Sequence, residues 1–448
     1  MSDEAALRAV TPVDGRYRRQ VEELSNYFSE YGLIRYRIKV ELEYLKLLVR
    51  TGVISLSGEK LGVIDEVQSS FTVGDAAYVK QLEEETRHDV DAVVRFLKKR
   101  LEEQGLGEVV QHIHLGLTSE DVNNIAYSLA LRDFNQLTLS PLLERLAKKL
   151  RALSKEHKLT VMLARTHGQP AVPTTLGKEL AVHMHRIDRI RKILGSFIFP
   201  AKLSGAVGTY AGLREVLGEK TLEHALGFVN QLGLEPWIAT KQTLPHDRLS
   251  EYLHRLTLLA SALLDLSRDL WLLCMLGYVE KKRIGVGSST MPHKVNPIEV
   301  ENAEGNLEIC ITLLSFMAHR LMVSRLQRDL SDSTIRRNYG TAAAYLTIAI
   351  KNITSFLDNI SFNREKMRED LLKSREWISE AVQIRLRLKG YDVMDEIRKL
   401  STANGDYKEN LRRFITSLGE EPDDIIPREP EDYLGVAGEV VDMLTEEE

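Results

Sequence analysis

A stretch rich in glycine, serine and proline, residues 285–297, holds residue types that can bind a carboxylate. Glycine and proline at this density cannot continue a helix, yet apolar helical patterns flank the stretch on both sides. We therefore expect a loop inserted between two core helices, and loops held by a rigid scaffold often carry function. Lys294 offers a point charge and Asn296 an amide donor, which together suit a carboxylate. The alternative is an ordinary glycine-rich connector.

Three other short runs gather polar and ionisable residues. Residues 118–121, T-S-E-D, are typical of a helix start with a hydroxyl cap and acids in the first turn, and a helix N-terminus also favours an anion. The runs 85–90 and 164–171 each contain one histidine, His88 and His167. A lone histidine is more often a structural or surface residue, and the first of these runs could be an exposed, charged helix turn.

Two of these segments resemble the signatures of a known family. Residues 287–297 are similar to the G-S-S-x-M-P-x-K-x-N-P loop of the fumarase/aspartase superfamily, and residues 165–171 resemble its R-T-H-G-Q-x-A run. Members of that superfamily break a C–N or C–O bond by anti β-elimination and release fumarate. The resemblance extends from Arg16 to about Arg337 and weakens after that.

The resemblance implies a role for each reactive residue. Ser288 would be the base that removes the proton beside a carboxylate, and His167 would be the general acid that protonates the leaving group. Lys294 and Asn296 would stabilise the resulting carboxylate dianion. Glu301 occupies the position of a carboxylate that orients the histidine, although it could equally lie on a solvated helix face.

A third run points to one branch of the superfamily. Residues 86–90, T-R-H-D-V, resemble a T-x-H-D-V run of the members that act on adenylosuccinate, which fumarases and aspartases lack. By this resemblance His88 would contact the substrate and assist proton transfer. Thr118 and Ser119 resemble the pair that binds a succinyl carboxylate in the family.

A nucleotide substrate also needs a phosphate site, and arginine forks and serine hydroxyls match phosphate oxygens well. The remaining substrate contacts implied by the resemblance are Arg16, Tyr17, Arg87, Asp89, Thr166, Gln242, Ser289, Arg328, Ser333 and Arg337. Many members of this branch carry Arg or Lys where this chain has Val295, and Arg where it has Asn302. The phosphate contacts of those two positions are therefore not carried over.

The resemblance implies cleavage of adenylosuccinate and of a succinyl-carboxamide ribotide, both with release of fumarate. It implies no metal or organic cofactor, no nucleic-acid or membrane partner, and a homotetramer whose active site is shared between subunits. The alternatives are another lyase of the superfamily (argininosuccinate lyase, aspartase or fumarase) or a catalytically inactive structural homologue. The joint presence of Ser288, His167, Lys294 and Asn296 argues against an inactive homologue.

The elements that must position these residues are helical. Apolar residues recur at three- and four-residue steps over residues 34–49, which predicts an amphipathic helix, and residues 248–277 are apolar on much of their circumference. Strand signals are thin, with no Asn-Gly or Asp-Gly between two alternating runs. The small residues of 204–209 suit a close backbone approach. We expect an all-α chain with an N-terminal domain, a central bundle of long helices forming a tetramer core and a C-terminal domain, over residues 1–111, 112–360 and 361–448.

The bulk composition restricts the class of protein. The chain has 448 residues, 43% of them hydrophobic and 28% charged, which is ordinary for a folded protein. A net charge of -5 argues against a general nucleic-acid binder. The two cysteines, Cys274 and Cys310, cannot form a disulfide framework, and the polar start of the chain lacks a signal sequence. We expect a cytoplasmic location.

Overall fold

The computed structural model describes residues 3–282 and 295–446. The chain divides into two compact units. Unit 1 comprises Met1–Leu142, Ile190–Ser261 and Gly305–Lys351, and unit 2 comprises Leu143–Arg189, Ala262–Glu304 and Asn352–Glu448. The boundary crosses long helices, so this division differs from the expected three consecutive domains, which remain a prediction.

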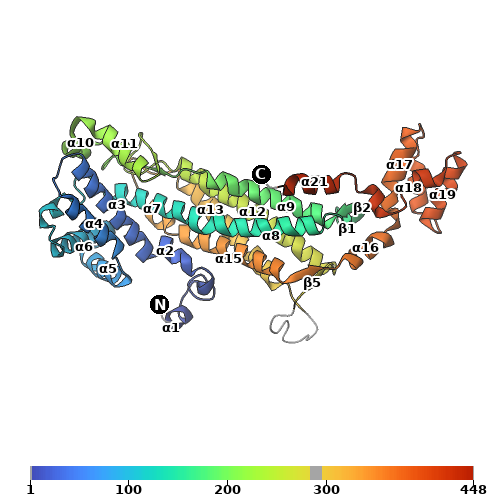
Figure 1. Cartoon of the computed structure of the whole chain (residues 1–448), viewed down its shortest axis with the longest axis horizontal. Helices are drawn as coiled ribbons and strands as arrows, with labels where there is room; N and C mark the ends of the chain where they lie inside the picture. Colours follow the sequence, from blue (N-terminus) through green and yellow to red (C-terminus); the bar gives the residue numbers. More distant parts are fainter. Residues whose placement is uncertain (1–2, 283–294, 447–448) are drawn as a thin grey trace. The chain divides into compact units, whose positions relative to one another are not determined.

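Helices dominate both units, and the predicted all-α class is confirmed (Figure 1). The helices of unit 1 are α1 (Asp3–Leu7), α2 (Ser25–Phe28), α3 (Glu30–Arg50), α4 (Gly58–Ser69), α5 (Val73–Thr86), α6 (Asp89–Glu103), α7 (Ser119–Phe134), α10 (Ala211–Leu217), α11 (Thr221–Gln231) and α14 (Ser331–Arg336). Five helices cross the boundary: α8 (Ser140–Glu156), α9 (Leu176–Gly195), α12 (Asp247–Met275), α13 (Ile298–Arg320) and α15 (Tyr339–Asp358).

The described strands are short and pair only in twos. They are β1 (Val161–Thr166) with β2 (Gln169–Thr175), β3 (Pro200–Ala201) with β4 (Glu235–Pro236), and β5 (Val279–Lys281) with β6 (Ile360–Phe362). Unit 2 also contains α16 (Arg364–Lys373), α17 (Ser379–Leu388), α18 (Met394–Ser401), α19 (Tyr407–Ser417), α20 (Pro422–Ile425) and α21 (Ala437–Thr445). Short 3-10 segments lie at Arg18–Gln20, Glu22–Leu24, Gly107–His112, Gly218–Lys220, Arg375–Ile378 and Pro430–Tyr433, and a π segment at Asn135–Leu139.

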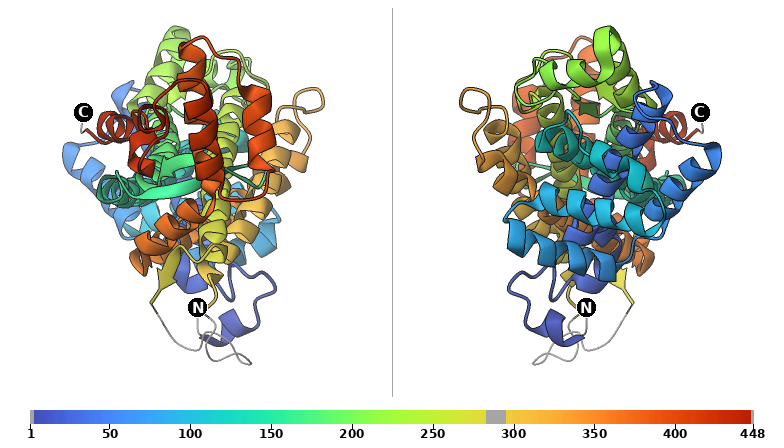
Figure 2. Two further views of the ribbon diagram at one scale, coloured as in Figure 1. Left: turned by 90° about the vertical axis from the view of Figure 1, so that its right-hand side faces the viewer. Right: turned by 90° about the vertical axis from the view of Figure 1, so that its left-hand side faces the viewer.

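The core of unit 1 follows the predicted helical stripes. Ser29 caps the start of α3, because its hydroxyl accepts the backbone N–H of Gly32 at 3.0 Å. On the apolar face of α3, Ile34, Ile38 and Leu42 are buried. Helix α7 packs against α3 and is buried on nearly every side. Helices α5 and α6 lie side by side, in blue in the right-hand view of Figure 2. They hold the loop between residues 86 and 89 at their junction.

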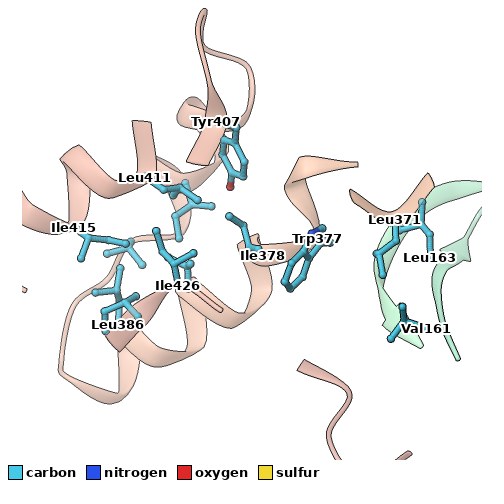
Figure 3. Packing of buried hydrophobic residues seen from close by; sticks show 14 residues of the cluster. Val161, Leu163, Leu371, Trp377, Ile378, Leu386, Tyr407, Leu411, Ile415 and Ile426 are labelled. Carbon is cyan, nitrogen blue, oxygen red and sulfur yellow. The ribbon is translucent and has the colours of Figure 1, made fainter. Parts of the chain in front are cut away.

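The C-terminal helices of unit 2 close over a separate apolar cluster, which we call the C-terminal cluster (Figure 3). Its members include Trp377, Ile378, Leu386, Tyr407, Leu411, Ile415 and Ile426, together with Leu371 of α16 and with Val161 and Leu163 of β1. The base of the β1–β2 hairpin is thus anchored by residues from the end of the chain. Among the residues that the structure describes, no helix is long and apolar enough to cross a membrane.

Candidate active site

The junction of α5 and α6 brings His88 to the start of α7. Helix α5 ends at Arg87, which takes the left-handed conformation with φ 51° and turns the chain into the next helix. His88 then caps α6, because its Nδ1 accepts the backbone N–H of Asp91 at 3.2 Å. This contact leaves Nε2 of His88 facing the hydroxyl oxygen of Ser119 at 3.4 Å. The His88 side chain is half exposed.

Arg37 holds these two helix starts together. Its side chain is only 2% exposed, it forms an ion pair with Asp89, and its Nε donates to Oδ1 of Asn123 at 2.8 Å. Burial alone would raise the pKa of Asp89, but Arg37 and Arg337 outweigh burial and lower it, so the pair stays charged. Arg37 was not predicted from the sequence. The sequence did offer a signal for its burial, because Arg37 lies three residues after the buried Ile34 and is flanked by apolar residues of the same helix.

The predicted helix start at Thr118 is confirmed. Thr118 precedes α7, and its backbone N–H donates to the carboxylate of Asp121 at 3.0 Å. That fully buried carboxylate also accepts the ammonium of Lys202 at 2.9 Å and the backbone N–H groups of Ser204 and Gly205 at 3.0 and 3.1 Å. The start of α7 is therefore fixed to the segment of small residues that follows Lys202.

The next acid, Glu120, joins α7 to the segment predicted to bind phosphate. Its two carboxylate oxygens accept Nη1 and Nη2 of Arg336 at 2.7 and 2.9 Å, and Arg328 lies 3.2 Å away. Asp332 completes the group, 2.6 Å from Arg336 and 3.4 Å from Arg328. Arg328 is thus paired within the chain, and Arg336, which was not among the predicted substrate contacts, is almost fully buried.

The other predicted contacts of unit 1 lie on accessible surface. Arg337 forms an ion pair with Glu30 and lies 3.5 Å from Asp89, which links it to the run containing His88. The guanidinium of Arg16 stands 5.9 Å from the centre of the Tyr17 ring. Gln242 and Ser333 are each half-buried.

A cavity of about 430 Å³ lies beside these last two residues. It is lined by neighbours of Gln242, namely Lys241 and Thr243, and by Ser331 and Asp332, which precede Ser333. The buried imidazole of His246 also lines it. Burial lowers the pKa of His246 to about 3, and Arg336 and Arg328 act in the same direction, so this imidazole is neutral at physiological pH.

His167 and Thr166 belong to unit 2, on the β1–β2 hairpin. Residues 166 and 169 pair, and His167 and Gly168 form the two-residue turn with φ of 54° and 73°. His167 is exposed at the tip of this hairpin. Glu301, on α13, accepts the indole N–H of Trp271 at 3.1 Å. The predicted acid and the predicted carboxylate site of Ser119 therefore belong to different units.

Part of the predicted catalytic loop falls outside the described residues, namely Ser288, Ser289 and Lys294. Asn296 is described, and its backbone carbonyl accepts the ammonium of Lys281 at 3.0 Å. Of the two positions that depart from the family pattern, Val295 is half-buried and Asn302 accepts an amide N–H of Asn352 at 2.6 Å. In this chain position 302 therefore joins α13 to α15.

The fold is shared with solved structures of two bacterial enzymes. The structure is similar to fumarate lyase from Mesorhizobium sp. BNC1, with a TM-score of 0.78 and 23% identity, covering 95% of this chain and 97% of that chain. It is equally similar, with a TM-score of 0.78 and 23% identity, to the 3-carboxy-cis,cis-muconate lactonizing enzyme from Pseudomonas putida, covering 96% of this chain and 98% of that one.

Sequence comparison identifies the branch. The lyase family model matches residues 15–310, and the adenylosuccinate lyase C-terminal model matches residues 324–429. Adenylosuccinate lyase of Legionella pneumophila (strain Corby) is 38% identical over 97% of this chain and 98% of its own length. Adenylosuccinate lyase of Escherichia coli (strain K12) is 35% identical over 98% of this chain and 99% of its own length. The chain belongs to the adenylosuccinate lyase family within the fumarase/aspartase superfamily, as the sequence motifs predicted.

Proposed function

We propose that this chain cleaves adenylosuccinate to AMP and fumarate, and that it cleaves the corresponding bond of the succinyl-carboxamide ribotide. The observation that carries this proposal is the similarity to adenylosuccinate lyases over nearly the whole chain. The reaction is a C–N lyase reaction by anti β-elimination.

The proposed mechanism begins at the succinyl group. Ser288 removes a proton from the carbon beside one carboxylate, and the electron pair spreads onto that carboxylate as a dianion. Lys294 and Asn296 stabilise this charge. The electrons then form the double bond of fumarate while the C–N bond breaks and its pair moves to the purine nitrogen. His167, oriented by Glu301, protonates that nitrogen.

Unit 1 supplies the proposed binding surface for the rest of the substrate. Thr118 and Ser119 stand at the N-terminus of α7, where the helix dipole favours an anion such as the second succinyl carboxylate. His88 lies beside Ser119 and can contact the same group. The residues proposed to bind the nucleotide are Arg16, Tyr17, Gln242, Arg328, Ser333 and Arg337.

The proposed assembly is a homotetramer in which several chains complete each active site. Helices α12 and α13 support this proposal, because they expose large apolar side chains that a partner chain could cover, including Leu258, Met275, Ile309 and Phe316. The proposed compartment is the cytoplasm, and it is supported by the free thiols of Cys274 and Cys310.

The test is direct. Purified protein is incubated with adenylosuccinate, and AMP and fumarate are followed by absorbance and chromatography, with argininosuccinate and aspartate as parallel substrates. We expect both products in equal amounts from adenylosuccinate alone. Fumarate from a parallel substrate only would assign the chain to another lyase of the superfamily. No fumarate from any of them would indicate an inactive homologue.

A further inference from the structure

Three charged residues of unit 1 form a buried cluster that the proposed mechanism does not use. Glu120, Asp332 and Arg336, which we call the buried trio, have side chains at most 10% exposed. Arg336 donates to Glu120 through both arms of its guanidinium, at 2.7 and 2.9 Å, and to Asp332 at 2.6 Å. A bidentate pair of this kind fixes direction as well as distance.

Each member of the trio is the chain neighbour of a proposed substrate contact. Glu120 follows Ser119, Asp332 precedes Ser333, and Arg336 precedes Arg337. Consecutive residues of a helix point about 100° apart, so a side chain directed into the core leaves its neighbour free to face another way. The trio therefore fixes the backbone directly beside three residues that are proposed to bind substrate.

The trio also orients one proposed contact through its side chain. Arg328 lies 3.2 Å from Glu120 and 3.4 Å from Asp332. With Arg328 included, two positive and two negative charges balance inside the protein. A buried ion network of this kind contributes little net stability compared with apolar residues of the same volume, but it holds one geometry because any other leaves a buried charge unpaired.

We propose that the buried trio is a positioning device that sets the separation between the succinyl-carboxylate site at Ser119 and the nucleotide-phosphate site at Arg328, Ser333 and Arg337. This inference rests on the proposed function, because it takes those residues as the two ends of the substrate site. The trio itself touches no reacting atom. It acts by keeping two binding elements at the spacing that one substrate molecule spans.

A spacing device has a specific thermodynamic signature. Adenylosuccinate occupies the succinyl-carboxylate site and the nucleotide-phosphate site at once, and both sites contribute to its binding free energy only when their spacing is correct. AMP lacks the succinyl group and fumarate lacks the nucleotide, so each product needs one end alone. Loosening the trio should therefore weaken binding of the substrate far more than binding of either product.

The experiment compares Glu120→Gln with the double variant Glu120→Gln/Arg336→Met. Glu120→Gln leaves one positive charge unbalanced among the four charged residues of the ion network. The double variant restores the charge balance but not the ion pair between positions 120 and 336. Steady-state kinetics give kcat and KM for adenylosuccinate, calorimetry gives Kd for AMP and for fumarate separately, and thermal unfolding gives Tm. Glu108→Gln, which removes an exposed ion pair with Lys60, is the matched control.

We expect Glu120→Gln to raise KM by about tenfold or more, equivalent to about 1.4 kcal/mol, with the Kd of each product within about twofold of wild type. The double variant should regain Tm while KM stays high. If KM recovers together with Tm, or if both product affinities fall as much as substrate affinity, the trio is merely structural and the proposal is wrong. Absence of turnover in the wild-type protein would instead overturn the proposed function.

Discussion

The hydroxyl oxygen of Ser119 lies 3.4 Å from Nε2 of His88, although the two residues start different helices. Arg37 contacts both helix starts, because it binds Asp89 beside the histidine and Asn123 one turn beyond the serine. One buried guanidinium on a third helix thus bridges the two helix starts. Because it contacts both helix starts, Arg37 is the first target for mutation.

Replacing Arg37 with Met should destabilise the protein and lower turnover together. Asp89 would keep Arg337, 3.5 Å away, as its remaining partner, so the cost should lie below the ~3–5 kcal/mol of a buried charge left without any partner. Urea unfolding and kcat/KM measure the two effects. Arg50→Met, at an exposed position of the same helix, is the control and should change neither. Wild-type kcat/KM in a folded Arg37→Met protein would contradict the positioning role.

Replacing His167 with Gln should lower kcat by about 10²–10⁴, because general acid catalysis contributes that much. The side chain is exposed at a hairpin tip, so Tm should stay at the wild-type value. His224→Gln, on α11, makes the same chemical change at a histidine that is not proposed to act on the substrate and is the control. An effect on KM alone would make His167 a binding residue.

A shared active site predicts complementation between inactive chains. Ser288→Ala should abolish turnover without unfolding the protein, since it removes only the hydroxyl of the proposed base. When this variant and His167→Gln are mixed and their subunits exchange, some sites receive an intact serine from one chain and an intact histidine from another. Activity above that of either variant is expected. Exchange verified by mass spectrometry without any recovery would show that one chain supplies both residues.

Replacing Gly208 with Ala should damage the loop that carries Gln242. Gly208 has a φ of 82°, and a Cβ there would overlap the carbonyl oxygen of Thr240. Gly205→Ala is the matched control, because Gly205 has a similar φ of 76° but open space around a Cβ. We expect both variants to lose some stability from backbone strain, and only Gly208→Ala to raise KM strongly. Equal KM values in the two variants would contradict this.

The contact between His114 and Glu41 predicts a pH dependence of stability. Burial alone would lower the pKa of His114, but the Glu41 carboxylate at 2.6 Å outweighs it and raises the pKa above its usual value. The folded protein therefore binds the proton more tightly than the unfolded chain. The resulting stability is fully present below the unfolded pKa and is lost as pH rises through the folded pKa.

His114→Asn removes this titration and tolerates the left-handed backbone at that position, where φ is 64°. The difference in free energy of unfolding between wild type and His114→Asn should be largest at about pH 6 and shrink towards alkaline pH. Urea unfolding across this range measures it. A difference that grows with pH would mean that the proton is bound less tightly in the folded state.

Local patterns predicted the parts of the fold that depend on neighbouring residues. The stripe containing Ile34 and Ile38, the helix start at Thr118 and the close approach at Gly208 are all confirmed, because spacing of apolar residues, caps and glycine act within a few positions. The hairpin carrying His167 was not located, because a His-Gly pair takes the turn that Asn-Gly usually marks.

The contacts that organise the site could not be predicted in the same way. Arg37 and Asn123 are 86 positions apart, and Glu120 and Arg336 are 216 apart. Such pairs depend on which helix faces pack together, and local sequence patterns do not indicate that packing. The family motifs named Ser119 and Arg337 as contacts, but only the structure reveals the buried residues that hold them.

The C-terminal cluster ties the hairpin that presents the proposed acid to residues near the end of the chain. No predicted catalytic residue lies beyond Glu301, so a premature stop codon after residue 363 would leave all of them encoded. Such a product would lack Leu371 and Trp377, and Val161 and Leu163 at the base of the hairpin would face water. The hairpin that presents His167 would lose its anchor, and a nonsense mutation far from the proposed site would act as a loss of the proposed acid.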